Sequence, residues 1–146
     1  MIREFVIPGE PMAKQRPRFT RTGRTYTPAK TTNYENLVKV IYQEKYLGTN
    51  LLEGMLSAEI RAYCKPPKTS KMKLTAMLNG TIRPTKKPDC DNVAKIILDA
   101  LNNIAYDDDK NIVDLKVEKY FSDIPRVEVQ IKELSLNDEE RIRESI

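Results

Sequence analysis

Aspartates gather in two short segments of a chain that is basic overall. One segment holds Asp89 and Asp91, separated by one residue, and the other is the run 107–109, which ends in Asp109. Carboxylate oxygens are the hard ligands that Mg²⁺ prefers, about one or two per ion, with water and substrate phosphate completing the shell. An ion held in this way activates water and neutralises charge that develops on a phosphodiester. The first hypothesis is therefore metal-dependent nuclease chemistry.

The spacing of the first segment determines where its side chains point. In an extended chain, Asp89 and Asp91 project to the same side. If a helix begins around Asp91, then Asp91, Lys95 and Asp99 follow at i, i+4 and i+8 on its polar side, and Lys95 reaches the metal site. Two other interpretations stay open: one Asp is only an N-cap, worth about 1 kcal/mol, or Lys95 and Asp99 are only an exposed pair worth about 0.3 kcal/mol.

The second acidic segment also has a calcium interpretation. Asp107, Asp109 and Asn111, followed by Glu118, match ligand positions of an EF-hand loop. Ile112 stands where that loop requires a glycine, and residues 112–121 alternate like a strand, which weighs against calcium. A plain acidic turn explains residues 107 and 108, whereas Asp109, at the entrance to a strand, is the best placed to be a ligand.

Cationic side chains concentrate in two segments that hold no acid. Residues 11–30 and 65–87 contain 13 of the 25 Lys and Arg residues. Basic runs are often only solvated loops, but the first also carries Phe19 and Tyr26, which suit stacking on bases or contact with sugars. Contacts to DNA phosphates are expected from Lys14, Arg16, Arg18, Arg21, Arg24, Lys86 and Lys87.

Composition limits the alternatives further. The chain has 146 residues with 40% hydrophobic content and a net charge of +4, which fits one domain over residues 1–134 with a charged tail at 135–146. The absence of His excludes His-based nucleophile pairs and His-ligated zinc. Two cysteines are too few for a disulfide framework, and no apolar run approaches 18 residues, so we expect a cytoplasmic protein without a membrane span.

Hydrophobic spacing predicts the elements that must position these residues. Alternation predicts strands and 3.6-residue periodicity predicts helices, and the clearest periodicity lies just after Asp91. A possible capping box at Thr32 and Glu35 marks the start of the first helix. The predicted elements are a strand at 2–7, a basic loop at 11–28, a helix from 31 or 32 to 46, a strand at 55–64, a short helix at 70–78, a basic loop at 80–88, a helix at 92–104, and a hairpin of strands 112–121 and 126–134.

Three motifs follow one another along the second half of the chain. The run Pro88-Asp89-Cys90-Asp91-Asn92-Val93-Ala94-Lys95 precedes Leu98-Asp99-Ala100-Leu101, and Asp108-Asp109 leads into Ile112-Val113-Asp114. This pattern resembles the RusA family of Holliday junction resolvases. Gly23-Arg24-Thr25 with a following helix is similar as well, so the resemblance covers most of residues 1 to 133. One departure is Pro88, where family members can have an Arg before the first Asp; Lys87 is a candidate replacement.

The resemblance implies an α+β fold with a mixed sheet and a homodimeric, Mg²⁺-dependent endonuclease that makes paired nicks in four-way DNA junctions during recombination and repair. Mn²⁺ is the expected substitute metal. The resemblance also assigns metal binding and catalysis to Asp89, Asp91 and Asp109, and an auxiliary catalytic role to Lys95. Two other functions stay open from the residues alone: a nucleic-acid-binding accessory protein without catalysis, and a metal-dependent nucleotide phosphohydrolase.

Overall fold

A four-stranded mixed sheet forms the centre of the molecule. Its strands are β1 (Ile2–Pro8), β6 (Arg126–Glu133), β4 (Leu56–Cys64) and β5 (Ile112–Phe121), in that order across the sheet. β6 runs antiparallel to β1 and β4, whereas β5 lies at the edge, parallel to β4. The computed structural model describes residues 1–135, so the predicted tail lies, apart from Ser135, outside the described residues.

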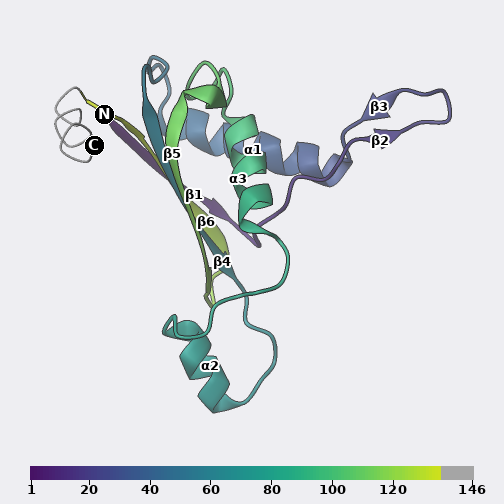
Figure 1. Cartoon of the computed structure of the whole chain (residues 1–146), viewed down its shortest axis with the longest axis vertical. Helices are drawn as coiled ribbons and strands as arrows, with labels where there is room; N and C mark the ends of the chain where they lie inside the picture. The colour runs from purple at the N-terminus through teal and green to yellow at the C-terminus, as the bar shows by residue number, and fades with distance from the viewer. Residues whose placement is uncertain (136–146) are drawn as a thin grey trace, which may run out of the picture.

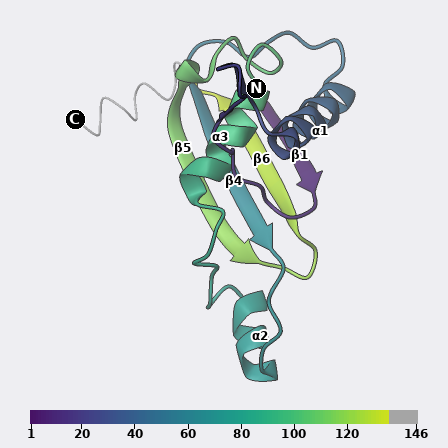
Figure 2. The ribbon, with the colours of Figure 1, turned by 90° about the vertical axis from the view of Figure 1, so that its right-hand side faces the viewer.

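Helices α1 (Ala29–Lys45) and α3 (Cys90–Ala100) cover one face of this sheet (Figure 2). Inward-facing residues alternate along β1, β4 and β6, and they meet an apolar stripe on each helix, as the periodicity of α3 predicts. The resulting core is made of Phe5, Ile7, Tyr34, Val38, Tyr42, Leu56, Ala58, Ile60, Ala62, Val93, Ile96, Ile97, Ala100, Val127, Val129 and Ile131, among others. Truncating a fully buried member such as Ile96 to Ala would cost about 2–5 kcal/mol. The α+β class with a mixed sheet is therefore confirmed.

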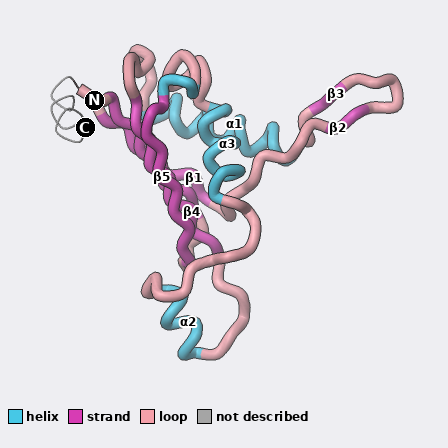
Figure 3. The backbone as a smooth tube through the Cα atoms, viewed as in Figure 1, coloured by secondary structure: helices cyan, strands magenta, loops and turns pink. Residues whose placement is uncertain are grey.

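Two parts of the chain project from this core (Figures 1 and 3). One is a small hairpin of β2 (Arg18–Phe19) and β3 (Thr25–Tyr26), which projects beyond the N-terminal end of α1. The other is α2 (Lys71–Leu78), which extends beyond the end of the sheet and has no buried residue. The prediction of an irregular loop at 11–28 is wrong for the hairpin, which turns at Gly23 with a φ of +82°.

Two further predictions need correction. The strands after residue 112 do not form a hairpin with each other, because β4 lies between β5 and β6 and pairs with both. The first helix begins at Ala29 after Pro28, with no side-chain cap, so the capping box predicted at Thr32 does not form. The strands at β1 and β4 and the short helix α2, capped by the Ser70 hydroxyl, agree with prediction.

Candidate active site

The start of α3 places Asp89, Asp91 and Lys95 on its solvent side. Asp89 occupies the N-cap position, but its side chain accepts no capping hydrogen bond, and Asp91 lies in the first turn. All three residues are exposed, because the apolar stripe of α3 faces the sheet. Within residues 1–135, no ion pair or side-chain hydrogen bond involves any of their charged groups. The simple capping role is therefore not realised, and these groups are free to bind a ligand.

Asp99, two turns further along α3, has a different environment. Its Oδ2 accepts a hydrogen bond of 2.7 Å from Lys14 Nζ, and the same ammonium lies 3.1 Å from Glu35 Oε1 on α1. Only 24% of the Lys14 and Asp99 side chains is exposed. The exposed Lys95–Asp99 pair that the spacing allowed does not form, and Asp99 instead pairs with Lys14, 85 residues away in sequence. This pair depends on the path of the N-terminal loop, which the spacing within the helix does not determine.

Asp109 lies near Asp99, at the far end of α3 from Asp91. Its backbone N–H donates to Asn102 Oδ1 at 2.9 Å, and it opens a single 3₁₀ turn (Asp109–Asn111) before β5. Desolvation, together with the carboxylates of Asp108 and Asp99, raises the pKa of Asp109. The opposite holds for Asp108, whose pKa is lowered chiefly because the Lys110 N–H donates to it. Crowded negative charge at Asp109 is the environment that a bound cation relieves.

Two separate carboxylate pairs therefore lie along α3: Asp89 with Asp91 at its start, and Asp99 near its end with Asp109 from the turn before β5. At 1.5 Å per residue, Asp91 and Asp99 are about 12 Å apart along the helix axis. Within the described residues, no three carboxylate or thiol side chains come together closely enough to hold a metal ion. The expected grouping of Asp89, Asp91 and Asp109 is thus not assembled here. Each pair alone still fits Mg²⁺, which takes about one or two carboxylates when water and substrate phosphate complete its shell.

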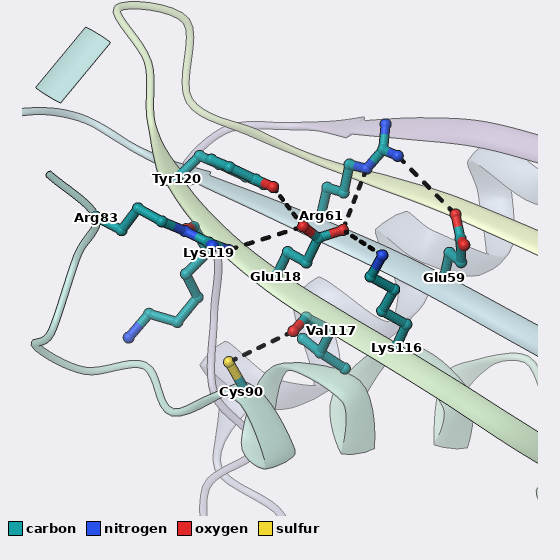
Figure 4. A network of polar contacts seen from close by, with 9 residues as sticks. All are labelled: Glu59, Arg61, Arg83, Cys90, Lys116, Val117, Glu118, Lys119 and Tyr120. Atoms are coloured by element: carbon teal, nitrogen blue, oxygen red, sulfur yellow. Dashed lines mark hydrogen bonds and ion pairs between the residues drawn. The ribbon is translucent and has the colours of Figure 1, made fainter. Parts of the chain in front are cut away.

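Hydrogen bonds hold the segment that leads into Asp89 against the free edge of β5 (Figure 4). Arg83 Nε donates to Lys119 O at 2.8 Å. Outside the view of Figure 4, Lys119 Nζ donates to Lys86 O at 2.7 Å. Cys90 Sγ makes a longer contact of 4.0 Å with Val117 O. The basic segment and the first turn of α3 are therefore held against the sheet, which fixes the position of Asp89.

Glu118 does not take part in a calcium loop. It lies within β5, on the sheet face without helices, where its carboxylate accepts a hydrogen bond from Tyr120 and forms ion pairs with Arg61, Arg83 and Lys116 (Figure 4). These contacts lower the pKa of Glu118, the Tyr120 hydrogen bond most of all. The calcium interpretation is therefore wrong.

Cationic side chains flank α3 on two sides. Arg16, Arg18, Arg21 and Arg24 are exposed on and beside the β2–β3 hairpin, and their guanidinium groups form no ion pair or hydrogen bond within the described chain. Phe19 is 75% exposed on the same hairpin. Lys86 and Lys87 are likewise exposed before Asp89, whereas Lys14 is committed to Asp99 and Glu35. These six cationic groups, which have no ion pair within the described chain, are suited to contact DNA phosphates.

No helix within residues 1–135 is long and apolar enough to cross a membrane.

Residues 8–132 match the family described as Endodeoxyribonuclease RusA. A Bacillus subtilis (strain 168) protein described as "Uncharacterized protein YqaN" is 40% identical over 138 residues, which cover 90% of this chain and 96% of that relative. The family match includes β4, β5, most of β6, both covering helices and every candidate carboxylate, whereas β1 lies before it except for Pro8. The chain therefore belongs to the RusA family of endodeoxyribonucleases.

Proposed function

We propose that this protein is a Mg²⁺-dependent endonuclease that resolves four-way DNA junctions in recombination and repair, with Mn²⁺ able to substitute. The observation that carries the proposal is the uncommitted set Asp89, Asp91 and Lys95 on one side of α3 in a RusA family member. Charged groups without an intramolecular partner, held on a rigid helix in a protein that also exposes free cations, are suited to hold a phosphodiester in place.

The side chains divide the work between metal binding and charge stabilisation. Asp89 and Asp91 would hold one Mg²⁺ at the start of α3, and Asp109 would hold a second beside Asp99. Ions held in this way would activate water and offset charge on the phosphate. Lys95 lies one helical turn from both Asp91 and Asp99, so its ammonium can stabilise negative charge on the non-bridging oxygens. The hairpin arginines bind phosphates away from the reacting group and orient the strand.

The substrate calls for two copies of this site. A four-way junction falls apart only after two opposed nicks, and one domain supplies one constellation, so a two-fold homodimer matches a nearly two-fold junction. Mixed dimers of wild-type and Asp91→Asn chains should accumulate open circles from a supercoiled cruciform, because one nick releases the cruciform before the second. Linear product at the wild-type rate, or monomers alone in light scattering with paired nicking intact, would contradict the dimer.

The main experiment compares a synthetic four-way junction with a linear duplex of the same sequence. Symmetric nicks are expected in the junction with Mg²⁺ and none with EDTA. Asp89→Asn, Asp91→Asn and Asp109→Asn should each bind the junction without cutting it, because Asn keeps the shape but loses the charge that holds the ion. Asp123→Asn, in the exposed turn between β5 and β6, is the matched control and should cut like the wild type.

Two results would overturn the proposal. Junction binding without cleavage in either Mg²⁺ or Mn²⁺ would indicate an accessory protein that only binds nucleic acid. Hydrolysis of a small chromogenic phosphodiester, with the junction left intact, would instead indicate a nucleotide phosphohydrolase.

A further inference from the structure

An open pocket of about 470 Å³ lies between the projecting segment that carries α2 and the end of the sheet. Its walls are largely apolar and come from parts of the chain far apart in sequence, among them Pro67, Met77, Ile82, Pro88 and Phe121. The volume lies within the range of roughly 300–1,000 Å³ that is typical of small-molecule sites. The pocket is therefore large enough for one flat heterocycle and has an aromatic wall on which to stack it.

Positive charge surrounds this apolar space. Lys65, Lys86 and Lys87 line the pocket, and their ammonium groups form no hydrogen bond or ion pair within the described chain. The remaining cation, Arg83, is committed to Glu118 and lies 4.2 Å from the centre of the Tyr120 ring. Glu10 is the one acid among the lining residues, and its Oε1 already accepts the Lys65 N–H at 3.1 Å. Cationic side chains therefore outnumber the one carboxylate among the lining residues, which suits a phosphate-bearing ligand.

The pocket also adjoins the candidate catalytic residues. Pro88 lines it, and the next residue is Asp89, the N-cap of α3. The contacts of Arg83 and Lys119 hold the intervening segment against β5. The pocket and the candidate metal ligand Asp89 are therefore neighbours along the chain.

We propose that this pocket receives one unstacked nucleobase of the cleaved DNA strand, next to the scissile phosphate, while Lys86 and Lys87 hold the adjoining phosphates. The inference rests on the proposed function and adds a determinant of where the strand is cut. Enzymes that bind an extruded base stack it between apolar and aromatic side chains. Bases at a branch point are the least costly to unstack, since their pairing is already interrupted. A pocket of fixed shape then favours some bases over others, which gives sequence preference to a protein whose other contacts are with phosphates.

The first test removes single bases from the substrate. Junctions with an abasic site at successive positions around the nick are cut under single-turnover conditions. One position beside the scissile phosphate should lose cleavage roughly tenfold or more, the expected effect of losing stacking on one base. Uniform sensitivity across the positions, or none at all, would overturn the pocket.

The second test fills the pocket. In Met77→Trp the added ring occupies the space, so the abasic effect and the preference for particular bases at that position should both disappear. Met72→Trp is the matched control on the same helix, since Met72 is 85% exposed and does not line the pocket. It should behave as the wild type, and an unchanged abasic profile in a folded Met77→Trp would also refute the proposal.

A fluorescence measurement separates this inference from the proposed catalysis. The Asp91→Asn protein is bound to junctions that carry 2-aminopurine at each position in turn, because this base brightens when it leaves the stack. A rise at one position that Met77→Trp abolishes supports the pocket even if the wild type cuts nothing. No rise at any position, with binding intact, would rule the pocket out even if cleavage is normal.

Discussion

Lys14 should stabilise the protein by holding the N-terminal segment to both covering helices. Its Nζ lies 2.7 Å from Asp99 Oδ2 and 3.1 Å from Glu35 Oε1, with 24% of the side chain exposed. Its backbone N–H also donates to Asn92 O at 3.4 Å. Charge-assisted hydrogen bonds contribute about 1.5–3 kcal/mol each when partners are shielded, so Lys14→Met should lose about 2 kcal/mol. For a chain of this length that is a fall in Tm of roughly 4–8 °C.

The assay is a double-mutant cycle in urea with Lys14→Met, Asp99→Asn and the pair together. A coupling free energy of about 1–2 kcal/mol is expected, because each single change leaves the other group without its partner. Lys30→Met, exposed on α1 and without a charged partner in the described chain, is the control and should cost under about 0.5 kcal/mol. Coupling below about 0.3 kcal/mol, or an equal loss in the control, would refute the reasoning.

The pH dependence of that contribution has a definite sign. Desolvation alone would lower the pKa of Lys14, but the hydrogen bonds and charges of Asp99 and Glu35 outweigh it and raise the pKa above its ordinary value of 10.5. The stabilisation is therefore fully present below pH 10.5 and is lost as pH rises through the higher folded-state pKa. The difference in free energy of unfolding between wild type and Lys14→Met should stay constant from about pH 6 to about pH 9 and shrink only in strong alkali.

Three further outcomes follow from the site. Asp109→Asn should raise the Tm of the metal-free protein at pH 7, because the raised pKa of Asp109 means that its charge is disfavoured in the fold. The gain should shrink as pH falls through that raised pKa and vanish below the ordinary pKa of 3.8. Lys95→Ala should lower the single-turnover cleavage rate on junctions while junction affinity, measured by gel shift, changes little. Replacing Arg16, Arg18 and Arg24 with Ala should weaken junction binding and flatten its salt dependence, since fewer counterions are released; an unchanged salt slope would remove the hairpin from the DNA surface.

The elements that sequence predicts well are those set by local periodicity. α3 and β4 each show a full apolar stripe or alternation, so their buried faces follow directly from residue spacing. The pairing of β5 is different, because which strand lies beside it depends on the whole sheet. A short turn between β5 and β6 favours a hairpin locally. In the sheet, however, β4 lies between them and its backbone pairs with both.

The candidate site divides in the same way. Asp89, Asp91 and Lys95 can be located from spacing because one helix carries them all. The ion pair of Asp99 does not follow from spacing, because its partner Lys14 lies in a segment without periodicity. The crowding around Asp109 depends on how the chain returns after α3. The distance between the two carboxylate pairs is likewise a property of the fold, because it depends on where β5 begins relative to α3.

The fastening of residues 83–90 along β5 has a consequence for solubility. An edge strand with unpaired carbonyls is a template on which other chains can add strands and aggregate. Here Arg83 and Cys90 occupy the carbonyls of Lys119 and Val117 on that edge. The segment that positions Asp89 thus also covers the exposed edge of the sheet. Insertions or deletions in this segment should therefore lower activity and promote aggregation together.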